Sequence, residues 1–154
     1  MAEELGVSRG SFYWHFEKRQ DLFDALLAYW SDGMTEAAVQ HIESLDAEPA
    51  KALRALTDFI INADLVRYDA AVRAWAFSDK RARSVLRRVD RRRIGYMTEL
   101  FAAAGFAPEA AAERARLLTV YLIGERVVGY HEPADVRRRR LKRRMRLVLE
   151  NQAE

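Results

Sequence analysis

Residues 5–16 read Leu-Gly-Val-Ser-Arg-Gly-Ser-Phe-Tyr-Trp-His-Phe, which is the pattern of a short helix, a tight turn and a second helix. The residues before the turn are good helix formers, and Gly6 suits the positive-φ position that ends such a helix. Ser8 can cap the following helix with its hydroxyl. The stretch therefore predicts a helix-turn-helix that starts almost at residue 1.

The second of these helices has one apolar face. Phe12 and Phe16 are four residues apart and share that face. The other sides carry groups that can bond base edges or phosphates, namely Arg9, Ser11, Tyr13, Trp14 and His15. The alternative is that Tyr13 and Trp14 are ordinary core residues of a helical bundle.

Across positions 3–22, with Arg19, Asp21 and Leu22 completing the match, the sequence resembles the DNA-binding motif of the tetracycline-repressor (TetR) family of bacterial transcription regulators. That motif reads Leu-Gly-Val, small polar residues, an aromatic-aromatic-His-Phe stretch and a basic residue. The resemblance implies a DNA-binding set of Ser8, Arg9, Ser11, Tyr13, Trp14, His15 and Arg19. Within it, Arg9 is expected to set sequence preference, and Tyr13 and Arg19 to hold phosphates.

The resembled family has a further helix ahead of this motif, and the present sequence starts too late to include it. We therefore expect a loose head and suspect that Met1 is an internal methionine or that the chain was shortened. The side chains that lose a packing partner are Leu5, Phe12, Phe16 and Leu22. Leaving such a side chain exposed costs about 1.5–3 kcal/mol.

Composition predicts a globular protein. Half of the 154 residues are apolar, and cysteine does not occur, which excludes disulfides, thiol catalysis and cysteine metal sites. No apolar run approaches the roughly 18 residues needed to cross a bilayer, and no signal peptide is evident. We expect a soluble, cytoplasmic protein with no membrane partner.

The formal net charge of +3 is small, but its distribution is uneven. Sixteen of the 26 Lys and Arg residues fall in residues 80–93 and 137–146. These stretches are either a second nucleic-acid surface or the solvated faces of two amphipathic helices, and we favour the second reading because apolar residues recur through both at helical spacing.

Almost all of the remaining sequence has helical periodicity, and no alternating strand pattern occurs. We expect an all-α fold with a partial helix-turn-helix head at residues 1–20 and a regulatory and dimerisation domain at residues 21–154. The expected helices span residues 21–44, 49–63, 69–77, 80–104, 108–130 and 134–150. Pro49, Pro108 and Pro133 lie at or just before helix starts, and Gly105 provides a left-handed cap.

In the resembled family the last two long helices form a four-helix dimer interface, which implies pairing of residues 111–130 and 134–149 with a second copy. The candidate interface residues are Leu117, Val120, Tyr121, Gly124, Val128, Leu141, Met145 and Val148. A two-fold homodimer would read a palindromic double-stranded operator. Like charges on the arginine-rich last helix would repel across a dimer axis unless they point to solvent.

The family also carries an effector pocket among its middle helices. Side chains suited to a mostly apolar pocket are Trp30, Met34, Phe59, Tyr68, Trp75, Tyr96 and Tyr121. The alternative for any one of them is simple core packing. Together they favour a small apolar or aromatic effector whose identity the sequence does not give.

Catalysis is not expected. His15, His41 and His131 are far apart, no glycine-rich phosphate loop occurs, and we expect neither cofactor nor metal. The leading hypothesis is a homodimeric, ligand-responsive repressor that effector binding releases from DNA. The alternative is a helical dimeric ligand-binding or interaction module that has lost DNA binding, which operator-binding measurements on this chain and on a version extended upstream would distinguish.

Overall fold

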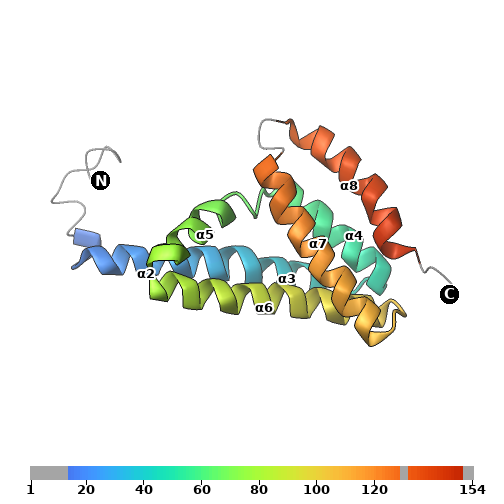
Figure 1. Ribbon diagram of the computed structural model, residues 1–154, viewed down its shortest axis with the longest axis horizontal. Coiled ribbons are helices and arrows are strands. Elements are labelled where there is room, and N and C mark those ends of the chain that lie inside the picture. The colour runs from blue at the N-terminus through green and yellow to red at the C-terminus, as the bar shows by residue number, and fades with distance from the viewer. Residues whose placement is uncertain (1–13, 129–131, 151–154) are drawn as a thin grey trace.

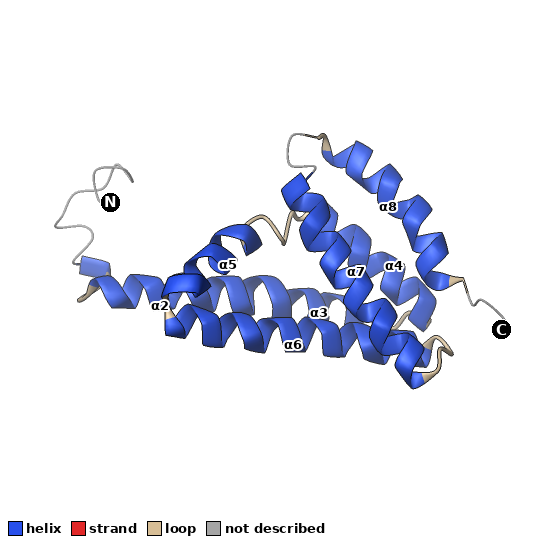
Figure 2. Cartoon of the chain, viewed as in Figure 1, coloured by secondary structure: helices blue, strands red, loops and turns tan. Residues whose placement is uncertain are grey.

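The computed structural model describes residues 14–128 and 132–150, and every regular element in these ranges is helical (Figure 2). The elements are α2 (Arg19–Ser31), the π-helix η1 (Asp32–Glu36), α3 (Ala37–Glu43), α4 (Pro49–Asn62), α5 (Asp69–Ser78), α6 (Lys80–Ala103), α7 (Pro108–Val128) and α8 (Ala134–Leu149). The all-α prediction is therefore confirmed. The expected domain boundary at residue 20 falls inside the first turn of α2.

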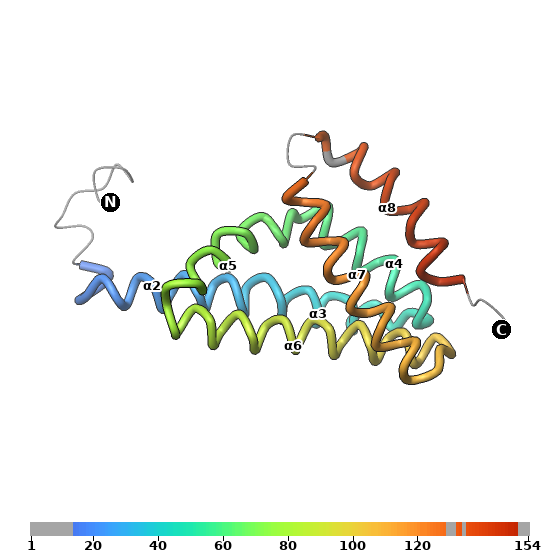
Figure 3. The backbone as a smooth tube through the Cα atoms, viewed as in Figure 1, coloured from blue at the N-terminus to red at the C-terminus, as the bar shows by residue number. Residues whose placement is uncertain are grey.

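The helix predicted over residues 21–44 is one rod made of three segments. α2, η1 and α3 follow one another without a loop and run alongside α6 (Figures 1 and 3). In η1 the turn is wider than in an α-helix, because the backbone N–H of Ala37 donates to the carbonyl of Asp32, five residues earlier. Sequence periodicity did not predict this wider turn.

Helix α6 has a well-defined start and stop. The Asp79 carboxylate accepts hydrogen bonds from the backbone N–H groups of Arg81 and Ala82 at 2.7 and 2.9 Å. These backbone hydrogen bonds, with the Ala82 bond the stronger cause, lower the pKa of Asp79. After α6, Gly105 adopts φ +94°, which confirms the predicted left-handed cap.

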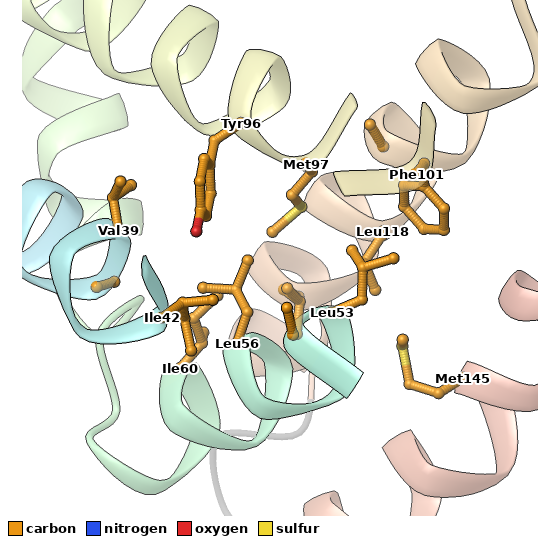
Figure 4. Packing of buried hydrophobic residues seen from close by; sticks show 14 of the residues in the cluster. Val39, Ile42, Leu53, Leu56, Ile60, Tyr96, Met97, Phe101, Leu118 and Met145 are labelled. Carbon is orange, nitrogen blue, oxygen red and sulfur yellow. The ribbon is translucent and has the colours of Figure 1, made fainter. Parts of the chain in front are cut away.

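Two apolar clusters hold the helices together. The larger lies between α3, α4, α6, α7 and α8, where Figure 4 shows Tyr96 and Met97 of α6 facing Leu56 and Val39 (Figure 4). The smaller lies between α2, α5 and the first half of α6 and includes the fully buried Trp30. α6 contributes to both clusters, so it is the structural link between the two ends of the molecule.

Within the described ranges, no helix combines the length and apolarity that crossing a bilayer requires.

Candidate ligand cavity and DNA-binding segment

A cavity lies at the junction of the rod, α4, α6 and α7. Its volume is about 40 Å³, or about 500 Å³ when the adjoining space that is open to solvent is included. The wall is mostly apolar and is formed by η1, α3, α4, the segment after α4, α6 and α7. Its apolar side chains are Met34, Ala38, Val39, Leu56, Ile60, Leu65, Val66, Met97, Leu122 and Ile123. The cavity is therefore narrow, and any ligand larger than a few atoms must widen it.

Four polar side chains complete the wall: Thr35 of η1, Arg93 and Tyr96 of α6, and Thr119 of α7. The Thr119 hydroxyl is already used, because it donates to the carbonyl of Ala115 at 2.8 Å. Burial raises the pKa of Tyr96, so its phenol stays protonated at neutral pH and can donate a hydrogen bond. Arg93 is the charged member of the wall.

Arg93 joins the cavity to a buried hydrogen-bond network. Its Nε donates to Thr35 Oγ1 at 3.1 Å, and its Nη1 donates to Asp69 Oδ2 at 2.6 Å. Asp69 is 1% exposed and also accepts from Trp30 Nε1 at 2.9 Å. The network thus connects α2, η1, α5 and α6 around one buried carboxylate.

A second arginine shares this carboxylate. Arg73 Nη2 lies 3.8 Å from Asp69 Oδ2, and the same guanidinium forms a two-pronged ion pair with Asp90 at 2.7 and 3.0 Å. The Asp90 hydrogen bond raises the pKa of Arg73, so this cation stays charged. Two guanidinium groups therefore balance two carboxylates, with Asp69 the more buried of the pair.

Of the seven pocket residues predicted from the sequence, the structure places Met34 and Tyr96 in the cavity wall. Trp30 is buried in the smaller cluster, where it bonds Asp69. Trp75 packs edge-on against Phe23, with ring centroids 5.2 Å apart.

The other three predicted pocket residues also lie outside this wall. Phe59 stacks on the ring of His41 at 4.3 Å, and Tyr68 is 43% exposed. The Tyr121 hydroxyl accepts a hydrogen bond from Arg144 at 2.7 Å. Burial is the largest cause that raises the pKa of Tyr121, while the bond from Arg144 lowers it. These aromatic rings belong to the helix packing and its edges.

Sequence reasoning missed Thr35 and Arg93 as wall residues and Asp69 as their buried partner. Arg93 was counted with the solvated face of a basic helix, yet its side chain is 13% exposed. Its pairing with Asp69 spans 24 residues of sequence. A pair so far apart in sequence leaves no local pattern by which it could be predicted. The one available signal was the position of a charged residue within an apolar stripe, which suggests a buried ion pair.

The candidate dimer residues separate into two groups. Leu117, Val120 and Val128 of α7 are exposed, and nothing lies within 4 Å of a Cβ built on Gly124, so this face of α7 is open. Leu141 and Met145, in contrast, are 1% and 2% exposed within the chain itself. They pack into the larger cluster because α8 turns its apolar stripe toward α4 and α7, with Val148 partly buried beside them.

Most arginines of the two basic stretches have protein partners. On α6, Arg92 pairs with Glu36 at 3.2 Å, and Arg83 donates to the carbonyls of Ala76 and Phe77. On α8, Arg140 pairs with Glu125 at 2.7 Å. These contacts support the reading of two amphipathic helices. Exposed Lys80, Ser84, Arg87 and Arg91, with the partly buried Arg83, still line a shallow basic hollow on α6.

Three members of the predicted DNA-binding set, Trp14, His15 and Arg19, are among the described residues and lie at the N-terminal end of the rod. Ser8, Arg9, Ser11 and Tyr13 are outside the described residues. Trp14 and His15 are exposed and helical, and their rings meet edge-on at 4.9 Å. The guanidinium of Arg19 lies 5.0 Å from the ring centroid of Phe23. The outward position of Trp14 differs from the core packing that was its alternative reading.

Within residues 14–128 and 132–150, no group of three or more His, Asp or Glu side chains is arranged to hold a metal ion.

Comparison with known protein families gives a match at the N-terminal end of the chain. Residues 1–26 match the family model described as bacterial regulatory proteins, tetR family. No solved structure matches the chain with significance. The matched segment covers the helix-turn-helix pattern and ends inside α2, beyond the expected boundary at residue 20. The N-terminal segment is therefore similar to this family of bacterial regulatory proteins, and the described residues that follow it are helical.

Proposed function

We propose that this protein is a ligand-responsive transcription repressor that acts in the cytoplasm and binds a palindromic operator as a homodimer. The observation that carries the proposal is the continuity of the rod. The family match over residues 1–26 runs into α2, and the same rod continues through η1 and α3 into the cavity wall. An event in the cavity therefore acts on the element that carries the DNA-binding segment.

The proposed DNA contacts are those that the sequence motif implies, with Arg9 reading base edges and Tyr13 and Arg19 holding phosphates. The exposure of Trp14 and His15 supports this assignment because both rings are accessible to a partner. A DNA selection experiment with the purified chain tests it. We expect enrichment of a palindromic sequence, and we expect Arg9→Ala to weaken its binding about tenfold and to relax base preference at one position in each half-site.

The proposed dimer surface is the open face of α7, formed by Leu117, Val120, Gly124 and Val128. Exposed apolar side chains along one helix face are typical of an interface between subunits. Leu141 and Met145 are no longer part of this proposal, since both are buried within the chain.

Light scattering on a Leu117→Glu/Val120→Glu variant tests this surface. We expect the native chain to be a dimer at micromolar concentration and the variant to be a folded monomer, because the introduced glutamates of the two copies would be buried facing each other across the axis. Phe77→Glu is the matched control, since Phe77 is an 85% exposed apolar residue on α5. A native monomer, or a variant that remains dimeric, would contradict the proposed interface.

In the proposed mechanism, the effector enters the narrow cavity and widens it. Effector affinity then differs between the narrow and the widened forms, which is the condition for a ligand to shift a conformational equilibrium. The change reaches the rod and alters the separation of the two DNA-binding segments. A dimer that binds ligand but enriches no DNA sequence would instead identify the protein as a ligand-binding module without DNA recognition.

A further inference from the structure

The polar part of the cavity wall carries a positive charge and no negative one. It contains one guanidinium, from Arg93, and three hydroxyls, from Thr35, Tyr96 and Thr119, but no carboxylate. A guanidinium only donates hydrogen bonds, whereas a bound cation needs acceptors or negative charge around it. The wall therefore suits a ligand with acceptor oxygens and disfavours a cationic one.

Arg93 has donor capacity to spare. A guanidinium has five N–H groups, and Arg93 directs one to Thr35 and one to Asp69. Among the described residues, Thr35 and Asp69 are its hydrogen-bond acceptors, and the side chain, which is 13% exposed, lines the cavity. A planar fork of this kind matches the two oxygens of a carboxylate.

Asp69 can tolerate a partial withdrawal of Arg93. Arg73 already lies 3.8 Å from the same Asp69 oxygen, so the buried carboxylate keeps a cationic neighbour when Arg93 turns toward a ligand. The Trp30 indole donates to the other oxygen of Asp69 at 2.9 Å, so Arg93 is not its sole hydrogen-bond donor. The two-cation arrangement thus reduces the cost of exchanging Asp69 for a ligand carboxylate.

The narrowness of the cavity adds a condition on shape. The cavity volume is only about 40 Å³, and ten apolar side chains form the remaining wall. A slender hydrocarbon chain requires less widening than a fused-ring molecule of the same apolar area.

We propose that the ligand is an unbranched or slender hydrocarbon with a terminal carboxylate, whose oxygens accept hydrogen bonds from Arg93. By drawing Arg93 from Asp69 and Thr35, it loosens the connection between α6, η1 and Trp30 of α2. The proposal rests on the proposed function in taking this cavity as the effector site. It goes further by naming the chemistry of the ligand and the side chains that transmit its binding.

Calorimetric titration of the purified chain tests the ligand class. The probes are decanoate, 1-decanol and decylamine, which share one hydrocarbon chain and differ in their end group. We expect decanoate to bind at least about tenfold more tightly than 1-decanol, and decylamine to bind most weakly. Equal affinity for decanoate and 1-decanol, or a preference for decylamine, would overturn the assignment.

Variants locate the effect at Arg93. Arg93→Gln is expected to bind 1-decanol normally and to lose the decanoate preference. The single change leaves the Asp69 carboxylate with less positive charge beside it and can destabilise the fold. The double variant Asp69→Asn/Arg93→Gln removes both charges, and we expect it to lose the decanoate preference as well. Arg92→Gln is the matched control, since Arg92 is the adjacent α6 arginine, pairs with Glu36 and does not line the cavity. A decanoate preference that survives in the double variant would contradict the role of Arg93.

Transmission is tested without DNA by NMR of the three tryptophan indole N–H signals. We expect decanoate to shift the Trp30 signal and to accelerate its hydrogen exchange more than those of Trp14 and Trp75, and this response to vanish in Arg93→Gln. An unchanged Trp30 signal at saturation would overturn the relay. Operator binding is measured separately, so a protein that shows the decanoate preference without recognising DNA contradicts the proposed function alone, while operator binding without the preference contradicts only this inference.

Discussion

Helices α6 and α8 each carry eight Lys and Arg residues, yet they use them in different ways. On α6, arginines reach acids on other elements: Arg81 pairs with Asp24 of α2, Arg92 with Glu36 of η1, and Arg93 with Asp69 of α5. These pairs connect α6 to the rod and to α5. The basic residues of α6 therefore help to position the helices around the cavity.

On α8 the apolar side chains hold the helix in place. Leu141 and Met145 are buried, while Arg140 and Arg144 share Glu125 of α7 at the rim. Lys142 and Arg143 are exposed. Two stretches with almost the same composition thus differ in their partners. α6 reaches acids on α2, η1 and α5, whereas α8 reaches acids on α7 and in the segment between α4 and α5.

The largest expected effect is on the buried network at α6. Asp69→Ala removes the acceptor of both Trp30 and Arg93 and leaves a guanidinium without its partner, so we expect a loss of about 3–5 kcal/mol in the free energy of unfolding. Urea denaturation followed by circular dichroism measures it. Asp24→Ala, which breaks the exposed pair with Arg81, is the matched control and should cost less than about 1 kcal/mol. Similar losses in both variants would remove the distinction between buried and exposed α6 pairs.

The second-largest effect is expected where apolar side chains of α8 pack against the rest of the chain. Leu141→Ala deletes a side chain that is 1% exposed, so we expect a loss of about 3 kcal/mol from reduced burial and the cavity left behind. Leu147→Ala changes the same residue type on the same helix at a 72% exposed position and should cost within about 0.5 kcal/mol. Urea denaturation of the two variants at a protein concentration that keeps them monomeric gives the difference. A small loss in Leu141→Ala would show that α8 is held mainly by its charges.

A smaller effect is expected at the α7–α8 rim. Glu125→Gln weakens the hydrogen bonds from Arg140 and Arg144, and because both guanidinium groups are partly exposed, we expect a loss of about 1–2 kcal/mol. Asp135→Asn is the control, since its pair with Arg139 is exposed at both ends. If Glu125→Gln cost as much as Asp69→Ala, the two helices would depend equally on their ion pairs.

The exposed cations should contribute least. Arg87→Ala on α6 and Arg143→Ala on α8 each remove an exposed charge that has no ion-pair partner among the described residues, so we expect changes within about 0.5 kcal/mol. Thermal unfolding at two salt concentrations measures both. A loss above 1 kcal/mol in either variant would reveal a structural role for the outer basic face.

A final test uses pH. Arg140 lowers the pKa of Glu132 through a 2.7 Å hydrogen bond, so the folded state binds a proton there less readily than the unfolded chain. The contribution of this carboxylate is complete above its unfolded pKa of about 4.3 and is lost as the pH falls through the lower folded value. We expect Glu132→Gln to reduce the melting temperature at pH 7 and to match the native chain near pH 2. Glu113→Gln, an exposed change on α7, should show no such convergence.

The sequence was informative about helix boundaries because their signals are local. Pro49, Pro108 and Gly105 were placed correctly, since proline fixes φ in a first turn and glycine tolerates the positive φ that follows α6. On α8, the sequence predicted which side chains are buried, but not which surface covers them. The stripe through Leu141 and Met145 was recognised, but whether it faced the same chain or a second copy depended on how α8 packs.

The cavity was harder to predict because its wall combines five parts of the chain. Met34 and Tyr96 were chosen for their residue types and do line it, whereas Trp30 was chosen on the same grounds and bonds Asp69 instead. Residue type alone does not distinguish these outcomes. The decisive residue, Arg93, lies in a run of three arginines whose neighbours face outward or toward Glu36.

The π-turn at η1 has a geometric consequence for the whole rod. A π-turn holds about one residue more than an α-turn, and each residue of an α-helix advances by about 100°. α2 and α3 are therefore rotated out of phase relative to one unbroken α-helix, and the wider turn lies where Thr35 meets Arg93. The π-turn at the edge of the cavity therefore determines the rotation of α2 about the axis of the rod, and with it the direction in which the side chains of α2 point.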